Sequence, residues 1–195
     1  MKKIKLLAAI GALFILIPAS SYAIVDFGVY GGYNLGGKSY KPVVYGPHLG
    51  IIAHPSFTLG EVVTLGLGAY YQRSYDVIQV NTFGYTQNKL THKDSVGLDG
   101  YIQFNIPKLN LRPYGRVSTN IWDQVNGWRI KSYKDLTTSE FFKTYAFGGG
   151  VAIPFASVPV LEKLNIYFEY LYTISKVAAT PKYTHTLHAG VKVMI

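Results

Sequence analysis

Apolar and polar residues alternate in segments of about ten residues, and this pattern limits the chain to few folds. In the last ten residues every second position is apolar, whereas those between them, except Met194, are polar or glycine. The apolar positions are Leu187, Ala189, Val191, Val193 and Ile195. Strand side chains point alternately to opposite faces, so this period predicts a strand between two different media. Such a strand needs a partner on each edge, or it leaves an edge that promotes aggregation.

The same alternation occurs eight times along the chain. The segments cover residues 24–33, 44–54, 62–73, 95–105, 111–122, 144–153, 164–173 and 186–195. Each is close to the roughly 9–11 residues that a tilted strand needs to cross a bilayer. Long connections at 34–42, 74–94, 123–142 and around Pro181 alternate with short ones. These features predict an all-β fold, an eight-stranded antiparallel up-and-down transmembrane β-barrel closed by its first and last strands.

Residues 1–23 have the organisation of a cleaved secretory signal peptide. Three lysines precede an apolar run from Leu6 to Ile17, Pro18 ends the run, and Ala23 follows as a small residue suited to cleavage. The run is shorter than the roughly 20 residues of a spanning helix. We therefore expect a signal peptide at 1–23 and one outer-membrane β-barrel domain at 24–195. The chain has no cysteine, so disulfides cannot stabilise this domain.

The composition indicates which face of the barrel meets lipid. Charged residues make up 15% of the chain, against roughly 25% in typical soluble domains. One face of the segments carries Val, Ile, Leu, Phe and Tyr, and the other carries glycine, polar and ionic residues. A soluble barrel would have this arrangement inverted. We therefore expect lipid outside and a polar lumen, with an interfacial aromatic girdle on the outer face. The girdle residues are Tyr45, Tyr71, Tyr145, Tyr170 and Tyr172.

The charges predicted to face the lumen are balanced. They are Asp26, Asp99 and Glu169 against Arg112, Arg116 and Lys192. Ions in a narrow, poorly hydrated interior must be paired. We expect closure to bring Asp26 to Lys192, and a register with Gln103 opposite Arg112 to place Asp99 opposite Arg116. Five inward tyrosines would fill the remaining space, which favours a plugged interior over the alternative of a small porin-like channel.

The remaining charge lies on the long connections. Loss of Lys2, Lys3 and Lys5 with the signal peptide lowers the formal net charge from +9 to +6. The connections hold eleven basic residues, Lys38, Lys41, Arg73, Lys89, Lys93, Arg129, Lys131, Lys134, Lys143, Lys176 and Lys182. Their five acidic residues are Asp76, Asp94, Asp123, Asp135 and Glu140. Such a surface attracts lipopolysaccharide phosphates, acidic glycans and host polyanions.

Two further observations concern the partners of these connections. Aromatic residues such as Trp128 are interleaved with the charges, which favours protein binding. No recognition motif accompanies the charge, so specific binding of nucleic acid is not expected. The alternative is that these lysines only solvate the loops and bridge to lipid phosphates.

The chain resembles the small eight-stranded outer-membrane proteins of the OmpX, OmpA-barrel and Opa type. The resemblance rests on the strand pattern, on residues 145–152 (YAFGGGVA), on 167–170 (YFEY) and on the C-terminal segment. It implies a monomer in the bacterial outer membrane, with cell-surface loops and a role in adhesion, host-factor binding or envelope integrity. It also implies recognition of the C-terminal strand by the barrel-assembly machinery. The family usually ends in phenylalanine, whereas this chain has Ile195.

Catalytic and metal-binding patterns argue against an enzyme. A barrel that deacylates lipid A would need a histidine and a serine two positions apart on one lipid-facing strand, with a nearby glutamate. Ser56 is two positions from His54, but His54 is on the polar face of its segment and Ser56 lies in the expected turn, so this pair is not lipid-facing. His185 and His188 point to opposite faces without a cysteine beside them. We therefore expect no catalytic residue, cofactor or metal, with a lipid A-modifying enzyme as the less favoured alternative.

Overall fold

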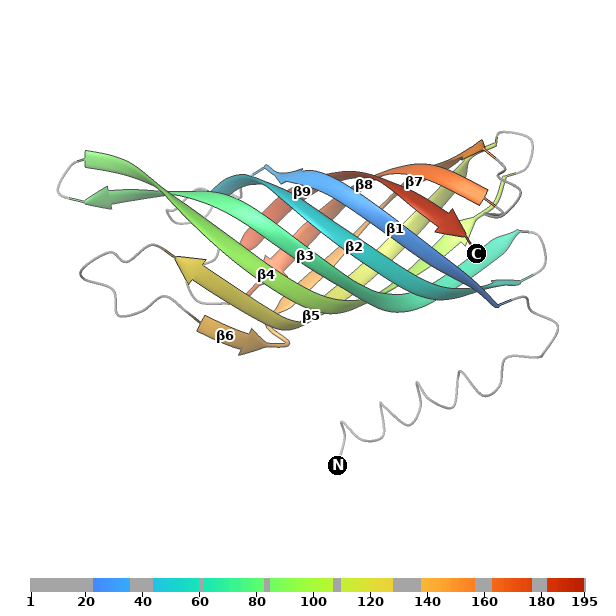
Figure 1. Ribbon diagram of the computed structural model, residues 1–195, viewed down its shortest axis with the longest axis horizontal. Helices are drawn as coiled ribbons and strands as arrows, with labels where there is room; N and C mark the ends of the chain where they lie inside the picture. Colours follow the sequence, from blue (N-terminus) through green and yellow to red (C-terminus); the bar gives the residue numbers. More distant parts are fainter. Residues whose placement is uncertain are drawn as a thin grey trace, which may run out of the picture.

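The fold is a sheet of antiparallel strands that closes into a barrel (Figure 1). The computed structural model describes residues 23–35, 44–59, 62–82, 85–106, 110–127, 138–156, 163–176 and 182–194. The strands are β1 (Ala23–Asn34), β2 (Val44–Leu59), β3 (Val63–Thr82), β4 (Tyr85–Phe104), β5 (Arg112–Gly127), β6 (Thr138–Phe141), β7 (Thr144–Ala156), β8 (Lys163–Ser175) and β9 (Tyr183–Met194). Among these described residues, no helix is long and apolar enough to cross a membrane.

The nine strands occupy eight positions around the barrel, which we call staves. Around the barrel the order is β4-β3-β2-β1-β9-β8-β7-β5, and β4 pairs with β5 to complete the ring. The short β6 pairs with β5 beyond the point where β7 stops, so it extends the β7 stave. Phe142, between β6 and β7, has a positive φ of 53°, which marks the irregularity in this stave. The predicted eight-stranded up-and-down barrel is confirmed.

Closure occurs between β1 and β9, as predicted. Nine consecutive pairs join them, from Asp26 opposite Met194 to Asn34 opposite Thr186. The barrel has two distinguishable ends (Figure 1). At the turn end β1 begins, β9 finishes and the connections are short. At the hairpin end, the β3–β4 hairpin projects well beyond the other strands.

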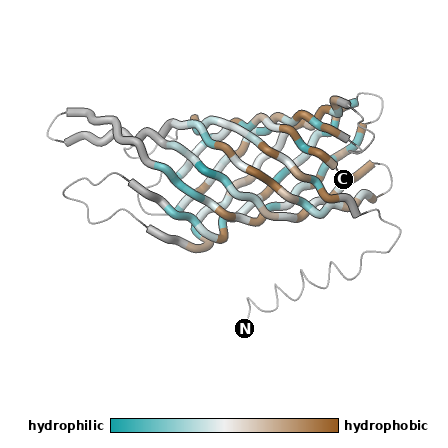
Figure 2. Tube along the Cα trace, in the orientation of Figure 1, coloured by the Kyte–Doolittle hydropathy of each residue, from teal (hydrophilic) through white to brown (hydrophobic). Residues whose placement is uncertain are grey.

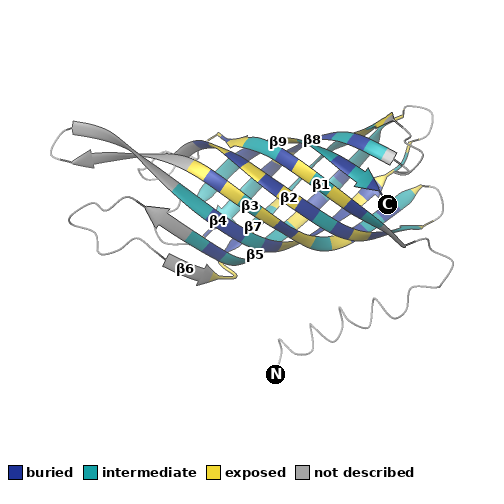
Figure 3. Ribbon diagram, viewed as in Figure 1, coloured by how far each residue is buried: buried dark blue, intermediate teal, exposed yellow. Residues whose placement is uncertain are grey.

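Burial alternates along the strands (Figure 3). Inward residues such as Asp26 and Tyr30 are buried, whereas their neighbours Phe27 and Val29 are exposed on the outer wall. The outer wall carries no described Lys, Arg, Asp or Glu side chain between the level of Arg73 and the turn end. Hydrophobic residues are accordingly spread along the barrel wall (Figure 2). The barrel therefore presents an uncharged band to lipid and keeps its ions inside.

The largest difference from prediction is the length of β3 and β4. The segment 74–94, expected to be a loop, continues the two strands, which pair from Val63 opposite Phe104 to Thr82 opposite Tyr85. Part of the expected loop 123–142 likewise belongs to β5 and β6. Beyond the membrane both faces of a hairpin meet water, so hydropathy stops alternating although the hydrogen-bond ladder continues.

Candidate functional site

Tyrosines and glycines pack against each other in the lumen. A Cβ atom added at Gly66 would lie 2.2 Å from Cε1 of Tyr101, the residue directly opposite on β4. The same relation holds for three further cross-strand pairs, Gly50 with Tyr30, Gly97 with Tyr70 and Gly190 with Tyr167. An inward glycine opposite an inward tyrosine is therefore the sequence signal for this packing. The rings fill the lumen because the neighbouring strand offers each one space.

A buried ion cluster crosses the centre of the lumen. The Arg116 guanidinium lies between two carboxylates, with Nη2 2.6 Å from Asp99 Oδ2 and Nη1 paired with Glu169 Oε1. His54 Nε2 lies 2.7 Å from Asp99 Oδ1, and His188 Nδ1 lies 2.6 Å from Glu169 Oε1. All five side chains are buried. The cluster joins staves on opposite sides of the barrel, which closes the lumen at this level.

The predicted register of β4 and β5 is wrong, although Asp99 and Arg116 still meet. Gln103 lies opposite Tyr114 rather than Arg112, and Asp99 lies opposite Ser118. The error is two residues, and a shift of two leaves every side chain on its own face. Asp99 therefore reaches Arg116 diagonally across the strand pair.

Closure was expected to bring Asp26 and Lys192 together as an ion pair. The structure does not join these two side chains directly. In the β1–β9 register Asp26 lies opposite Met194 and Lys192 lies opposite Gly28. The hydroxyl of Tyr101 donates a hydrogen bond to Asp26, and Lys192 Nζ lies 4.1 Å from the centre of the Tyr101 ring. The tyrosine thus connects the acid and the base through a hydrogen bond and a cation–π contact.

Arg112 also differs from its expected ion-pair role. Its Nη1 lies 3.3 Å from the side-chain oxygen of Asn165 and 3.6 Å from the sulfur of Met194. Both partners are neutral, and Arg112 is only partly buried near the turn end. Water can therefore stabilise this guanidinium without a carboxylate.

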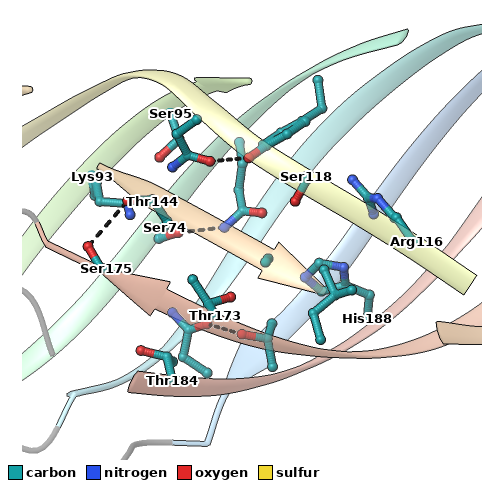
Figure 4. A pocket seen from close by; sticks show the side chains of 17 residues that line it. Ser74, Lys93, Ser95, Arg116, Ser118, Thr144, Thr173, Ser175, Thr184 and His188 are labelled. Carbon is teal, nitrogen blue, oxygen red and sulfur yellow. Dashed lines mark hydrogen bonds between the residues drawn. The ribbon is translucent and has the colours of Figure 1, made fainter. Parts of the chain in front are cut away.

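A polar vestibule lies between the ion cluster and the hairpin end (Figure 4). Its floor is Arg116 and His188, and small hydroxyl side chains line its wall. These include Ser74, Ser95, Ser118, Thr144, Thr173, Ser175 and Thr184. About 80 Å³ of the vestibule can be occupied by water, enough for several molecules with polar partners.

Lys93 and Asp123, predicted to lie on loops, face inward at this vestibule. Lys93 Nζ lies 3.3 Å from Asp123 Oδ1, and the carboxylate is fully buried. Ser95 and Thr144 donate hydrogen bonds to it at 2.7 and 2.8 Å. Lys93 therefore neutralises a structural acid.

Arg73 is paired on the outer wall, on the part of the hairpin beyond the uncharged band. It donates two hydrogen bonds to Asp94, from Nε at 2.7 Å and from Nη2 at 3.0 Å. The Tyr71 hydroxyl donates a third at 2.7 Å. The guanidinium holds the pKa of Asp94 below its ordinary value.

The other basic and aromatic residues predicted to bind ligands lie partly within and partly outside the residues that the structure describes. Lys143, Lys176 and Lys182 are exposed at the hairpin end. Lys89 belongs to β4, but its side chain is outside the described set. Outside the described residues lie Lys38, Lys41, Trp128, Arg129, Lys131, Lys134, Ile195 and the expected signal peptide up to residue 22. In the part that the structure describes, no group of three His, Asp or Glu side chains could hold a metal ion.

Comparisons with known proteins agree with this architecture. A family model described as the outer membrane protein beta-barrel domain matches residues 7–194. No curated protein matches the chain. The crystal structure of Neisserial surface protein A is similar with a TM-score of 0.54 at 16% identity, over 87% of this chain and 95% of that one. This likeness shows the same fold.

Two further solved structures are similar at lower scores. The N-terminal β-barrel domain of Pseudomonas aeruginosa OprF has a TM-score of 0.44 at 16% identity, over 90% of this chain and 100% of that one. Ail, the attachment invasion locus protein of Yersinia pestis, was crystallised with the heparin analogue sucrose octasulfate. It has a TM-score of 0.46 at 13% identity, over 90% of this chain and 99% of that one.

Proposed function

Because the chain belongs to the family of outer membrane protein β-barrel domains, we propose that this outer-membrane barrel binds polyanions at the cell surface through its basic, aromatic-bearing loops. The barrel acts as a rigid, lipid-embedded scaffold that holds the loops in place. Adhesion through acidic glycans or host factors is the role that this surface serves. A role in envelope integrity alone would leave the loop charges without a ligand.

The observation that carries the proposal is the excess of basic over acidic residues in the long connections. The pairs Arg73–Asp94 and Lys93–Asp123 remove two basic and two acidic residues from the loop charges. Nine basic residues then remain against three acidic ones, an excess of six that equals the net charge of the mature chain. An excess concentrated at one end of a molecule creates a field that attracts and orients anions.

The lumen supports a binding protein over the alternative of a channel. The Arg116 cluster spans the interior, and buried tyrosines fill the space on its turn-end side. An eight-stranded barrel leaves room only for packed side chains. Planar-bilayer recordings of the refolded barrel should therefore show no steady conductance. The less favoured enzymatic alternative predicts altered lipid A masses in cells that produce the protein.

The test is heparin binding by the refolded barrel across a salt series. Replacing Arg129, Lys131 and Lys134 by Gln should weaken binding about tenfold at low salt, because each exposed charge pair contributes up to about 1 kcal/mol. The difference should shrink as salt screens the charges. A comparison variant with Lys143, Lys176 and Lys182 replaced by Gln has the same net charge, so a larger loss of heparin binding in the first variant would mean that the connection 123–142 contributes more than net charge alone. Binding that is unchanged in the first variant and insensitive to salt would exclude the mechanism.

Orientation has its own test on whole cells. A protease added outside should cut within residues 123–142 if the long connections face outward. Cleavage confined to residues 154–163 would show that the barrel has the opposite orientation.

A further inference from the structure

Three lysines come together at the hairpin end of staves β7, β8 and β9. Lys143 precedes β7, Lys176 follows β8 and Lys182 precedes β9. The amide of Lys176 donates to the carbonyl of Lys143 at 2.8 Å, and the amide of Ser175 donates to the carbonyl of Lys182 at 2.9 Å. All three side chains are exposed, and no carboxylate with a described side chain forms an ion pair with them. The ladder therefore holds three cations on adjacent strands that no described carboxylate neutralises.

The lysines lie on the outer side of the wall. Thr144 and Ser175 hydrogen-bond to each other inside the barrel at 3.2 Å. Because strand side chains alternate, the neighbouring Lys143 and Lys176 project outward. Lys182 Nζ lies 5.1 Å from the centre of the outward Tyr183 ring. The three ammonium groups thus face the surroundings of the barrel, away from the vestibule.

An aromatic belt lies directly below these lysines on the same staves. Tyr172 stacks on Tyr183 with ring centres 5.9 Å apart, and Phe147 meets Tyr172 edge-on at 5.3 Å. At the β6–β7 corner Phe141 and Phe142 are also exposed. Aromatic rings of this kind sit at the level of lipid headgroups. The lysines just beyond the belt are therefore at the depth of lipid phosphates.

An outward groove continues the site toward the middle of the barrel. The residues that line it include the small Gly31, Gly149 and Ala189 and the larger Phe168, Tyr170 and Leu187. The groove is almost wholly apolar and lies on staves β7, β8, β9 and β1. It lies several residues below the lysines along β8 and β9, where the acyl chains of a surrounding lipid run.

On the opposite side of the rim, the described side chains differ from this combination. There the outward Arg73 is neutralised by Asp94, and the Tyr71 hydroxyl donates a hydrogen bond to the same carboxylate. Free cations above an aromatic belt and an apolar groove are complementary to a lipid with an anionic headgroup. We propose that the β7–β9 face binds a phosphorylated lipid of the surrounding leaflet, with its phosphate on Lys143, Lys176 and Lys182 and one acyl chain in the groove.

The test is native mass spectrometry of the refolded barrel with didodecanoyl phosphatidic acid, beside the diacylglycerol of the same chain length. The triple variant Lys143→Gln, Lys176→Gln, Lys182→Gln should bind the phosphorylated lipid about 100-fold more weakly, since each basic residue near an anionic lipid surface is worth about fivefold. Lys38→Gln, Lys41→Gln, Lys131→Gln is the control with an equal change of charge. It should retain wild-type affinity, and heat-modified gel mobility verifies that both variants fold.

Two further measurements test where the acyl chain lies and whether the bound phosphate belongs to a lipid. Ala189→Phe should fill the groove and weaken the lipid severalfold without changing the lysines, and inorganic phosphate should not compete with the lipid. Equal binding of diacylglycerol, equal loss in the control, or full retention by the lysine variant would overturn the proposal. So would unchanged affinity in Ala189→Phe or displacement by inorganic phosphate. Heparin binding by the loop variants reports separately on the proposed function.

Discussion

The two halves of the lumen are both polar, yet they are built differently. On the turn-end side of Arg116, the rings of Tyr101 and Tyr167 pack against glycines of the neighbouring strands and leave little space. On the hairpin side, serine and threonine hydroxyls line a vestibule with room for water. The size of the inward side chains, more than their polarity, thus decides where the barrel is plugged. A fully buried charge in the packed half, such as Asp99, needs a protein partner, whereas a neutral polar group that lines the vestibule can be satisfied by water.

The largest expected effect is at Arg116 in the packed half. Arg116→Met leaves Asp99 and Glu169 buried without their shared cation, and removing one partner of a buried pair typically costs about 3–5 kcal/mol. Urea unfolding of the refolded barrel, followed by tryptophan fluorescence, measures the loss. Arg112→Met is the matched control, and it should cost about 1 kcal/mol or less because Arg112 contacts neutral groups. Equal losses in the two variants would contradict the described pairing.

A smaller effect is expected at the tyrosine packing. Gly66→Ala places a methyl group against the Tyr101 ring and should lower the free energy of unfolding by about 1–3 kcal/mol through overpacking. Gly115→Ala is the control on the outer face, where the nearest atoms to an added Cβ are 3.9 Å away. That variant should be neutral or slightly stabilising. If both alanines were neutral, the lower lumen would be less tightly packed than described.

The smallest effect is expected in the vestibule. Thr184→Val keeps the shape of a partly exposed lining residue but removes its hydroxyl. Because water can reorganise around the change, stability should stay within about 0.5 kcal/mol of wild type in the same urea experiment. A loss comparable to that of Gly66→Ala would mean that the vestibule is dry and packed, which would remove the contrast between the halves.

The alternation of apolar and polar residues shows which face of the sheet each residue occupies. Much of the architecture could therefore be predicted from it. It identified the eight staves, the closing pair and the inward position of Asp99, Arg116 and Glu169. It could not fix the β4–β5 register, since a shift of two residues leaves each face unchanged. It also could not show that Tyr101 lies between Asp26 and Lys192, because that contact depends on three strands together.

The β3–β4 hairpin shows where the signal itself disappears. Within the bilayer, lipid and lumen impose opposite preferences on the two faces, and the pattern is clear in β3 up to Arg73. Beyond it polar residues such as Gln79 and Asn88 occur on paired strands without a regular period, as is expected where both faces of a hairpin meet water. The inward pairing of Lys93 with Asp123 was missed because both residues lie in segments that were expected to be loops.

The pairing of β1 with β9 has a consequence for the order of folding. Asp26 meets Met194, 168 positions later in the chain, whereas the β3–β4 hairpin can start from Thr82 opposite Tyr85, three positions apart. Closing a loop of that length costs about 4.5 kcal/mol of chain entropy, before the small constant term. The seam should therefore form last, after the local hairpins have shortened the effective loop. Until it forms, two long unpaired edges are exposed at once, so this step is when the nascent barrel is most prone to aggregation.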